Sequence, residues 1–407
     1  MTILTNKNIL LGVTGSIASY KAADLASKLT QAGANVNVIL TNAAEKFITP
    51  LTFQSVTGHT AYTDKDLWGA EGHVLHVQLG KQADLIVIAP CTANTMAKLA
   101  HGLSDDLLSV TCLTSTADIL IAPAMDGGMY DHVATQENLS TLLTRGVLVA
   151  GPTTGHLASG LSGKGRMLET SELLGHIRIA LAKHGKLKNK KIIVTAGGTQ
   201  EAIDPVRVIT NHSSGKQGYA LAQSAIDLGA EVTLITTPTA LTPPVGAKVI
   251  HVKSVLDMLE ALSNESADAL IMSAAAADFR PKHVAKEKIK KRDGIPHIEL
   301  EVAPDILKTV TANRSDKKRY KIVVGFAAES QDLLENASDK LKSKGLDFIA
   351  ANDITSNDAG FAVDTNRITL LFADGKKEAL PLLSKSEVAE KNFRTRCKIV
   401  GVICEFW

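Results

Sequence analysis

Small and hydroxyl-bearing residues follow a predicted buried strand at two places in this sequence. In the second half, a β-branched run at 192–195 leads into a Gly-Gly-Thr turn at 197–199 and then a polar stretch at 211–216. In the first half, a strand at 9–11 leads into Gly-Val-Thr-Gly-Ser at 12–16. Glycine turns that precede a helix N-terminus let backbone N–H groups surround an anion. Both places therefore predict phosphate-binding chemistry.

The first turn is a weaker signal than a dinucleotide-binding fingerprint. Gly12 and Gly15 form only a Gly-x-x-Gly pattern, and the next strand, at 36–40, is followed by Thr41-Asn42 instead of an acid. An acidic residue would be needed there to bind a ribose hydroxyl. The turn suits the phosphate of a mononucleotide better than NAD, although on this motif alone a turn without a ligand is an equally good interpretation.

Alternating strands and helices must position these turns. In the first half, a helix is predicted at 21–32, strands at 83–89 and 119–122 end in polar loops, and 98–113 is a helical region. In the second half we expect helices and strands to alternate as well: strands at 248–252, 269–273, 321–326 and 348–351, and helices at 220–227, 255–262 and 332–344. This order predicts an α/β fold of two doubly wound, mainly parallel-sheet Rossmann-like domains, the first of them flavodoxin-like.

Length and composition fit this organisation. The 407 residues are 45% hydrophobic and 21% charged, which indicates a globular protein of two domains, 1–186 and 187–407, joined by a basic, solvated linker near 185–189. A net charge of +2 gives no sign of a nucleic-acid partner. The apolar N-terminal run is too short for a membrane span, and it leads straight into a glycine turn, so it is interpreted as a first strand and not as a signal peptide. We therefore expect a cytoplasmic protein without a membrane partner. Cys91 and Cys112 are interpreted as packed thiols.

Residues near the C-terminus break the pattern. A helix is predicted at 171–183 to close the first domain and another up to Lys391 to close the second. Residues 392–407 do not continue that helix and turn apolar, with Cys397 and Cys404. A last strand, a reading-frame slip or a fusion junction would each explain this tail.

Four segments of the first half resemble the flavin-containing cysteine decarboxylase family: GSIASYK (15–21), APCTANT (89–95), PAMDGGMY (123–130) and GHLASGLSGKGRM (155–167). The second half resembles the phosphopantothenate–cysteine ligase family. Together, over roughly residues 5–390, they resemble the bacterial bifunctional proteins of coenzyme A biosynthesis. The resemblance implies that the ligase joins 4′-phosphopantothenate to L-cysteine and that the decarboxylase converts the product, 4′-phosphopantothenoylcysteine, to 4′-phosphopantetheine and CO₂.

The decarboxylase resemblance implies bound FMN. A cysteine carboxylate has no electron sink, and in the family the flavin oxidises the thiol-bearing carbon to a thioaldehyde and is later reoxidised. The spacing H-x-x-L before the strand selects His76 over His73 as the active-site histidine, which can act as a base near neutral pH, with a surface histidine as the alternative. Gly15, Ser16, Ile17 and Thr41 would hold the FMN phosphate, Thr92, Ala93 and Asn94 would line the flavin, and Met129 and Arg166 would bind substrate.

Two positions depart from the family pattern. Asp126 stands where an asparagine is familiar, and an ionised carboxylate would repel a substrate carboxylate, so it is either protonated or has another role. Ser159 stands in the glycine-rich flap where many members carry a proton-donor cysteine, and an alcohol is a far weaker acid than a thiol. Both remain candidate catalytic residues.

The ligase resemblance implies CTP as the nucleotide and an acyl-cytidylate intermediate, with Mg²⁺ on the phosphates. Asn211 would hold the acyl intermediate, Arg207 would act in the second step, and Lys288 would reach the triphosphate. Ser213, Ser214 and Gly215 would bind the substrate phosphate. Asp278 is the candidate metal ligand. The CTP contacts carried over by position are Met272, Ser273, Ala274, Asp278, Lys288, Ala303, Pro304, Asp305, Ile306, Phe326, Lys340 and Lys344.

Other classes of function remain open. A non-catalytic or regulatory flavin domain would explain Asp126 and Ser159, and an NAD dehydrogenase is disfavoured by the missing ribose-binding acid. The resemblance also implies a homo-oligomer with trimeric flavin domains and dimeric ligase domains, of which a dodecamer is one form.

Overall fold

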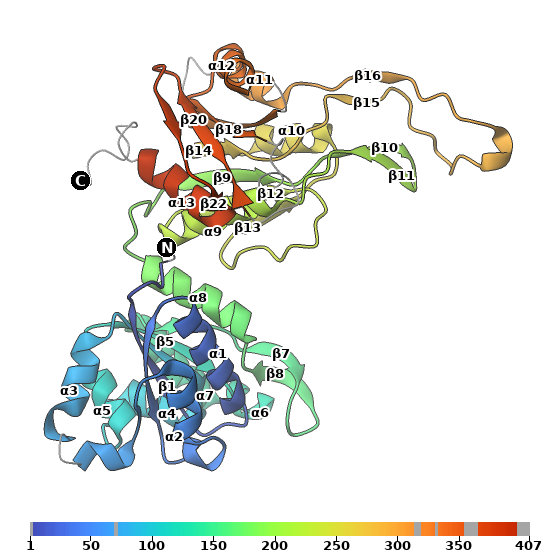
Figure 1. Ribbon diagram of the computed structural model, residues 1–407. Coiled ribbons are helices and arrows are strands. Elements are labelled where there is room, and N and C mark those ends of the chain that lie inside the picture. The colour runs from blue at the N-terminus through green and yellow to red at the C-terminus, as the bar shows by residue number, and fades with distance from the viewer. Residues whose placement is uncertain (1–2, 69–71, 313–318, 330–332, 354–364, 397–407) are drawn as a thin grey trace. The chain divides into compact units, whose positions relative to one another are not determined.

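The computed structural model describes residues 3–68, 72–312, 319–329, 333–353 and 365–396, and the chain divides into two compact units, 1–183 and 184–407 (Figure 1). Each unit is an α/β domain built on one mainly parallel sheet. The predicted fold class is confirmed. Among the described residues, every helix is too short or too polar to cross a membrane.

The first domain has a six-stranded parallel sheet in the order β3-β2-β1-β4-β5-β6. Its strands are β1 (Asn8–Val13), β2 (Asn35–Leu40), β3 (Ala61–Thr63), β4 (Leu85–Cys91), β5 (Asp118–Pro123) and β6 (Leu148–Val149). Its helices are α1 (Ser19–Gln31), α2 (Pro50–Thr57), α3 (Gly72–Gln82), α4 (Ala93–His101), α5 (Leu107–Thr114), α6 (Gly127–Asp131), α7 (Val133–Thr144) and α8 (Thr170–Ala182). A hairpin of β7 (Thr153–His156) and β8 (Ser162–Arg166) stands outside the sheet.

Alternation along β1 explains why helices cover both faces of this sheet. Ile9, Leu11 and Val13 pack into a core with α1, α2 and α8, whereas Leu10 packs into a second core with α3, α4, α5 and α7. Burying such aliphatic side chains contributes about 1.5–3 kcal/mol each. The order reverses between β1 and β4, so the turns after these strands diverge and leave a crevice where ligands of such sheets bind.

The second domain repeats the plan with an eight-stranded sheet in the order β13-β12-β9-β14-β17-β18-β20-β21. Its strands are β9 (Lys191–Ala196), β12 (Glu231–Thr236), β13 (Lys248–His251), β14 (Ala267–Met272), β17 (Tyr320–Glu329), β18 (Phe348–Asp353), β20 (Ile368–Phe372) and β21 (Lys377–Ala379). Its helices are α9 (Lys216–Asp227), α10 (Val255–Asn264), α11 (Ile306–Thr311), α12 (Leu333–Ser343) and α13 (Lys385–Arg396). Here the order reverses between β9 and β14, and β20 and β21 are antiparallel.

Three small sheets complete the second domain. They are β10 (Gln200–Asp204) with β11 (Arg207–Thr210), β15 (Phe279–Pro281) with β16 (Leu300–Val302), and β19 (Thr365–Asn366) with β22 (Leu383–Ser384). We call residues 279–302 the arm. The arm and the β10–β11 hairpin extend together from the body of the domain (Figure 1).

The structure corrects several sequence-based expectations. The region 98–113 is two helices, because Asp106 accepts from Ser109 N–H and forms a capping box that starts α5. The stretch after residue 199 is a hairpin, and α9 starts at Lys216. The linker is not fully solvated, because Leu187 is buried and donates its N–H to Leu228 O at 2.7 Å.

The prediction that the last helix stops before residue 392 is wrong, since α13 runs to Arg396. Residues 397–407, with Cys397 and Cys404, lie outside the described part of the chain. Cys91 and Cys112 are buried thiols, as predicted. Burial raises the pKa of both, to about 12 for Cys112.

Candidate functional sites

The turn between β1 and α1 is built to approach a ligand closely. A Cβ on Gly15 would lie 2.4 Å from the Ala43 Cβ, so only glycine fits. Ser16 Oγ accepts from Ala18 N–H at 3.3 Å, and α1 begins without a side-chain cap. The first N–H groups of a helix have no partner within the helix. However, Ser16 N–H donates to Thr14 O at 2.8 Å, and the N–H groups of Ser19 and Lys21 donate to Ser16 O and Ala18 O at 3.0 Å each. It is therefore the close backbone approach at Gly15 that suits this turn to an anion.

The side chain of Thr14 ties this turn to the loop after β4. Its hydroxyl donates to Pro90 O at 2.7 Å and accepts from Thr92 N–H at 3.1 Å. Thr92 in turn caps α4 by accepting from Thr95 N–H at 3.3 Å, and Thr41 accepts from Ala44 N–H at 3.3 Å at the end of β2. The structure thus brings Gly15–Ile17, Thr41 and Thr92–Ala93 to one sheet edge, where Asn94 is exposed on α4.

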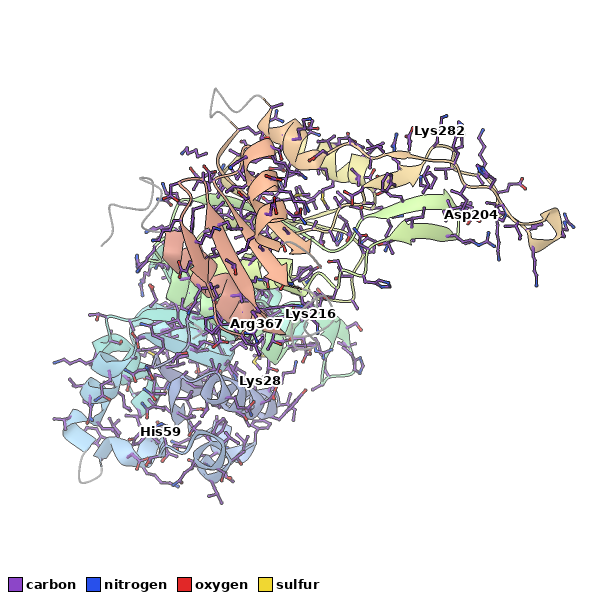
Figure 2. All side chains as sticks on the ribbon, turned by 45° about the horizontal axis from the view of Figure 1, so that its top comes forward. Lys28, His59, Asp204, Lys216, Lys282 and Arg367 are labelled. Carbon is purple, nitrogen blue, oxygen red and sulfur yellow. The ribbon has the colours of Figure 1, made fainter. Side chains whose placement is uncertain are left out.

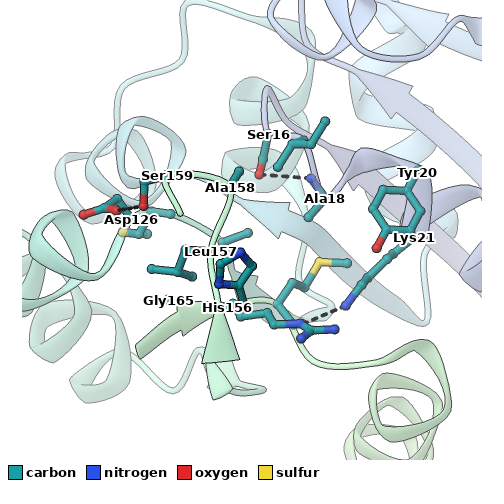
Figure 3. A pocket seen from close by; sticks show the side chains of 15 residues that line it. Ser16, Ala18, Tyr20, Lys21, Asp126, His156, Leu157, Ala158, Ser159 and Gly165 are labelled. Atoms are coloured by element: carbon teal, nitrogen blue, oxygen red, sulfur yellow. Dashed lines mark hydrogen bonds between the residues drawn. The ribbon is translucent and has the colours of Figure 1, made fainter. Parts of the chain in front are cut away.

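A cavity of about 480 Å³ opens beside this turn (Figure 3). Its walls come from the β1–α1 turn, from Met125 and Asp126 after β5, and from the β7–β8 hairpin with the residues that follow it. We call residues 153–166 the flap. The flap contributes His156 and Ser159 to the cavity, and both were within the segment that predicted a substrate cover.

Three charged side chains at the cavity form a chain of ion pairs. Lys21 Nζ, on a nearly buried side chain, donates to Met167 O at 3.1 Å and to Glu169 Oε1 at 2.8 Å. Arg166 Nη2 contacts the same carboxylate oxygen at 2.7 Å. The hydrogen bond from Lys21 is the main reason that the pKa of Glu169 is lowered. Two cations against one carboxylate leave the cavity wall suited to an anionic ligand.

Asp126 has a structural role that the sequence left open. Its Oδ1 accepts from Gly128 N–H at 2.9 Å and caps α6, and its Oδ2 accepts from Ser159 Oγ at 2.8 Å. These hydrogen bonds, that from Ser159 first, lower the pKa of Asp126. Of the two alternatives, the structure favours an ionised carboxylate with another role over a protonated one. Met129 is exposed on α6 and is not part of the cavity wall.

His76 lies on α3 and does not line the cavity. Its buried Nδ1 has no hydrogen-bond partner among the described residues. Unpartnered buried polar atoms are uncommon in folded proteins. Within one copy of the domain, His76 and the flap are therefore not brought together.

In the second domain, the loops after β9 and β14 are joined at the sheet edge. Ala274 N–H donates to Thr195 Oγ1 at 3.1 Å, and Ala275 N–H donates to Gly197 O at 2.8 Å. The register pairs Met272 with Gly325, which sets half-buried Phe326 beside the loop that Met272 opens. The predicted nucleotide residues 272–274 and Phe326 are thus neighbours, and 274–278 is a loop rather than a helix start.

Two further predicted CTP contacts meet at α11. Asp305 caps this helix by accepting from Lys308 N–H at 3.0 Å, and its Oδ2 lies 3.1 Å from Lys344 Nζ. Lys340 lies one helical turn before Lys344, and the backbone N–H of Lys344 donates to the carbonyl oxygen of Lys340. Ala303 N–H donates to Asp278 O at 2.9 Å, which connects 303–306 to the loop after β14.

Asn211 is held against that loop from the β11 side. Its Nδ2 donates to Ala275 O at 3.3 Å and to Ala276 O at 3.2 Å. A Cβ on Gly198 would lie 2.8 Å from Asn211 O, so glycine allows this approach. Ser213 and Ser214 follow, and Gly215, at a φ of +77°, is the N-cap of α9. The predicted phosphate residues therefore stand at a helix N-terminus.

Arg207 and Lys288 lie further out, where the β10–β11 hairpin meets the arm. The buried carboxylate of Asp204 accepts from the N–H groups of Val206 and Arg207 at 2.8 and 2.9 Å and from Ile289 N–H at 3.2 Å. Arg207 Nη1 contacts Asp204 at 3.0 Å and its Nη2 donates to Ile289 O at 3.1 Å. Burial alone would raise the pKa of Asp204, but these hydrogen bonds and the Arg207 charge lower it.

Lys288 is exposed next to Ile289, so this contact fixes the backbone that carries it. Figure 2 shows Asp204 and Lys282 on these two extensions, away from the sheet. The structure therefore brings Arg207 next to the segment that carries Lys288, where the β10–β11 hairpin meets the arm and not at the edge with Met272 and Phe326.

Sequence reasoning missed several residues of these sites. Lys21, Tyr20, His156 and Glu169 belong to the first site, and Asp204 holds the second together. The sequence could have indicated Glu169, because an acidic residue three positions after Arg166 can form an ion pair with it. The described residues contain no group of three His, Cys, Asp or Glu side chains placed to hold a metal, and Asp278 is a single exposed carboxylate.

Comparison with known proteins assigns a family to each domain. Residues 2–182 match the family model "Flavoprotein", and residues 187–397 match "DNA/pantothenate metabolism flavoprotein C-terminal domain". A solved structure of the C-terminal domain of a CoaBC protein is 42% identical, covers 52% of this chain and 95% of its own, and has a TM-score of 0.43.

Two full-length relatives are similar over both domains. The coenzyme A biosynthesis bifunctional protein CoaBC of Bacillus subtilis (strain 168) is 47% identical over 392 residues, 95% of this chain and 96% of that protein. The CoaBC protein of Mycobacterium tuberculosis (strain ATCC 25618 / H37Rv) is 43% identical over 399 residues, 95% of each chain. This chain therefore belongs to the family of coenzyme A biosynthesis bifunctional proteins CoaBC.

Proposed function

We propose that the two domains catalyse consecutive reactions, with the ligase in the second domain and the decarboxylase in the first. The bifunctional enzyme makes 4′-phosphopantothenoylcysteine from 4′-phosphopantothenate and L-cysteine with CTP, and then decarboxylates it to 4′-phosphopantetheine. The observation that carries this proposal is the similarity to CoaBC proteins over 95% of the chain, with both family models in the expected order.

FMN is the flavin that fits the first domain. The cradle at Gly15, which any Cβ would fill, suits its phosphate. When bound, FMN supplies the reversible two-electron oxidation that makes loss of CO₂ possible. Ser16 and Ile17 bind the phosphate, Thr41 adds a hydroxyl, and Thr92, Ala93 and Asn94 line the flavin. Arg166 orients the substrate, Met129 contacts it from outside the cavity wall, and the flap excludes water.

His76 acts in this proposal on a site of a neighbouring copy. Its unpartnered buried Nδ1 and its distance in the fold from the flap support a flavin site completed by two chains. The trimeric state of this domain remains a prediction. His156, on the flap, adds an imidazole to the cavity wall.

In the second domain, residues 272–274 and 303–306 with Phe326 bind the cytidine, and Lys340 and Lys344 bind phosphate. Asn211 positions the acyl intermediate, Arg207 assists attack by the cysteine amine, and Ser213, Ser214 and Gly215 hold the substrate phosphate. Mg²⁺ commonly takes one or two carboxylates plus nucleotide phosphates, so a single Asp278 fits it.

Exposed apolar side chains on the arm and the β10–β11 hairpin support dimerisation of the ligase domains. Ile295 is fully exposed, and Val302, Val206 and Phe279 are 78%, 62% and 55% exposed. Phe279 and Val302 are opposite each other in the arm, and exposed apolar residues on an extension favour association with a second chain. A partner's arm would bring its Lys288 to the sheet edge, where Lys288 could stabilise the leaving pyrophosphate. A cytoplasmic location remains a prediction.

Mass spectrometry of one reaction mixture tests this function. Protein loaded with FMN is mixed with 4′-phosphopantothenate, cysteine, CTP and Mg²⁺, and 4′-phosphopantetheine, CMP and pyrophosphate are expected. Accumulation of 4′-phosphopantothenoylcysteine alone would support the second candidate, a ligase with a non-catalytic flavin domain, which Asp126 and Ser159 would explain. Absence of both products would overturn the proposal.

A further inference from the structure

One side-chain contact holds the tip of the flap. Residues 158–161 are exposed beyond the buried side chain of Leu157. Within the flap, Gly160 N–H donates to Leu157 O at 3.0 Å and Leu161 O accepts from Leu157 N–H at 2.8 Å. Among the described residues, the tip makes one hydrogen bond to the rest of the domain, from Ser159 Oγ to Asp126 Oδ2 at 2.8 Å (Figure 3).

The loop that carries Asp126 also holds the base of the flap. Met125 N–H donates to Gly165 O at 3.0 Å. A Cβ on Gly165 would lie 2.2 Å from Met125 O, so the two backbones are in close contact there. The base is thus fixed by backbone packing, whereas the tip depends on a single pair of side chains.

The direction of this hydrogen bond limits what Ser159 can do. Asp126 already accepts from Gly128 N–H, and an ionised carboxylate can only accept. Ser159 must therefore donate its one proton to Asp126. Its oxygen lone pairs remain for the cavity, so the closed flap offers a ligand an acceptor at this position and not an acid.

We propose that Asp126 and Ser159 form a latch that keeps the flap tip closed over the cavity, and that Ser159 is a positioning residue and not the proton donor. The two departures from the family pattern then become one feature. The latch itself is independent of the proposed decarboxylation; only its effect on turnover rests on that function.

Amide hydrogen exchange on the FMN-loaded full-length protein tests the latch directly. The amides of Leu157 and Gly160 are hydrogen-bonded at the tip, and losing one hydrogen bond to a charged acceptor should accelerate their exchange roughly tenfold or more in Ser159→Ala. Ser162→Ala, a matched change on β8 outside the cavity wall, should leave the tip unchanged. Asp126→Asn keeps a good helix cap but replaces a charged acceptor by a neutral amide, so an intermediate rate is expected. The double variant Asp126→Asn/Ser159→Ala should exchange at nearly the same rate as Ser159→Ala alone, because both changes remove the same hydrogen bond.

Steady-state kinetics separate a latch from an acid. With 4′-phosphopantothenoylcysteine, Ser159→Ala should raise KM by roughly fivefold while kcat stays within about threefold, because closure is lost but protonation is not. A fall in kcat of about 100-fold or more at unchanged KM, as expected for a missing proton donor, would overturn the positioning role. Unchanged exchange at the Leu157 and Gly160 amides would overturn the latch. If the wild type itself forms no 4′-phosphopantetheine, the proposed function fails, but the exchange result still decides the latch.

Discussion

In the first domain, the turn after β1, the loop after β5 and the flap enclose a cavity within one copy of the domain. In the second domain, the sheet edge holds Met272 and Phe326, but the arm carries Lys288 away from it. Both domains have the same reversal of strand order, β1/β4 in one and β9/β14 in the other.

The difference lies in the length and attachment of the covering segment. The flap is a short hairpin whose base packs on the loop beside the cavity, so it closes its own site. The arm is attached at its base to the loop after β14 and at its middle to the β10–β11 hairpin through Asp204. A segment fixed in that extended position is suited to reach another chain, and the predictions below test this contrast.

The largest effect should come from removing a lysine either from the arm or from the sheet edge of the second domain. Lys288→Ala and Lys344→Ala should each lower ligase turnover by roughly 100-fold or more, since each removes a cation from the developing charge. If arms exchange between the chains of a two-fold dimer, mixed dimers of the two variants keep one intact site, and co-expression restores about a quarter of wild-type activity.

Each variant alone should decarboxylate added 4′-phosphopantothenoylcysteine at the wild-type rate, which controls for misfolding. Activity that stays at the level of the single variants after co-expression would show that the arm serves its own chain.

Blocking the cradle in the first domain should have the next largest effect. Gly15→Val places side-chain atoms where Ala43 already stands, and an overpacking cost near 3 kcal/mol corresponds to roughly 100-fold weaker FMN binding. Flavin absorbance after purification measures the loss, and ligase turnover should stay unchanged. Gly102→Ala is a control for the presence of a side chain alone: its φ of +68° adds a backbone strain that Gly15 does not have, but no atom lies within 4 Å, so flavin content should stay unchanged. Normal flavin content in Gly15→Val would argue against this turn as the phosphate site.

The sequence predicted the sheet edges of both domains well, because glycine turns after β-branched strands encode them locally. It placed Gly15, Thr41, Thr92, Met272 and Asn211 where the structure has them, at the ends of strands or in the turns that follow them. Roles within those loops stay predictions. The short-range pattern sufficed because each turn follows its own strand directly.

Features that depend on contacts between distant segments could not be predicted. The β10–β11 hairpin is stabilised by Asp204, whose partner Ile289 is far away in the sequence. A polar stretch with one proline reads as a loop until that partner is known. In the same way, Asp126 and Ser159 look like two unrelated substitutions until the flap folds back and pairs them.

A smaller effect is expected from loosening the arm. Asp204→Ala removes the acceptor of three backbone N–H groups and should accelerate hydrogen exchange at 206–210 and 286–290 by about tenfold, whereas Asp204→Asn should keep part of the protection. The pKa of Asp204 is lowered in the folded state, so its stabilising effect is complete above the ordinary aspartate pKa, about 3.9, and is lost as pH falls through the lower folded value. Equal exchange in all three proteins would show that the hairpin does not hold the arm.

The smallest effects should come from the ion pairs that link candidate ligand-binding cations to acids, and they should differ between the domains. Asp305→Asn keeps the cap of α11 and removes only a partly exposed partner of Lys344, so its cost in unfolding free energy should be below about 1 kcal/mol. Glu169→Gln leaves Lys21, whose side chain is 7% exposed, without its carboxylate, and a buried charge that loses its partner should cost more, about 1–2 kcal/mol after allowance for the exposed acid. Exchange of the most protected amides of α11 and α1 reports the two losses separately. If Asp305→Asn lost more unfolding free energy than Glu169→Gln, the contrast would be reversed. The sheet edge of the ligase domain would then depend on its ion pair more strongly than the cavity of the first domain does.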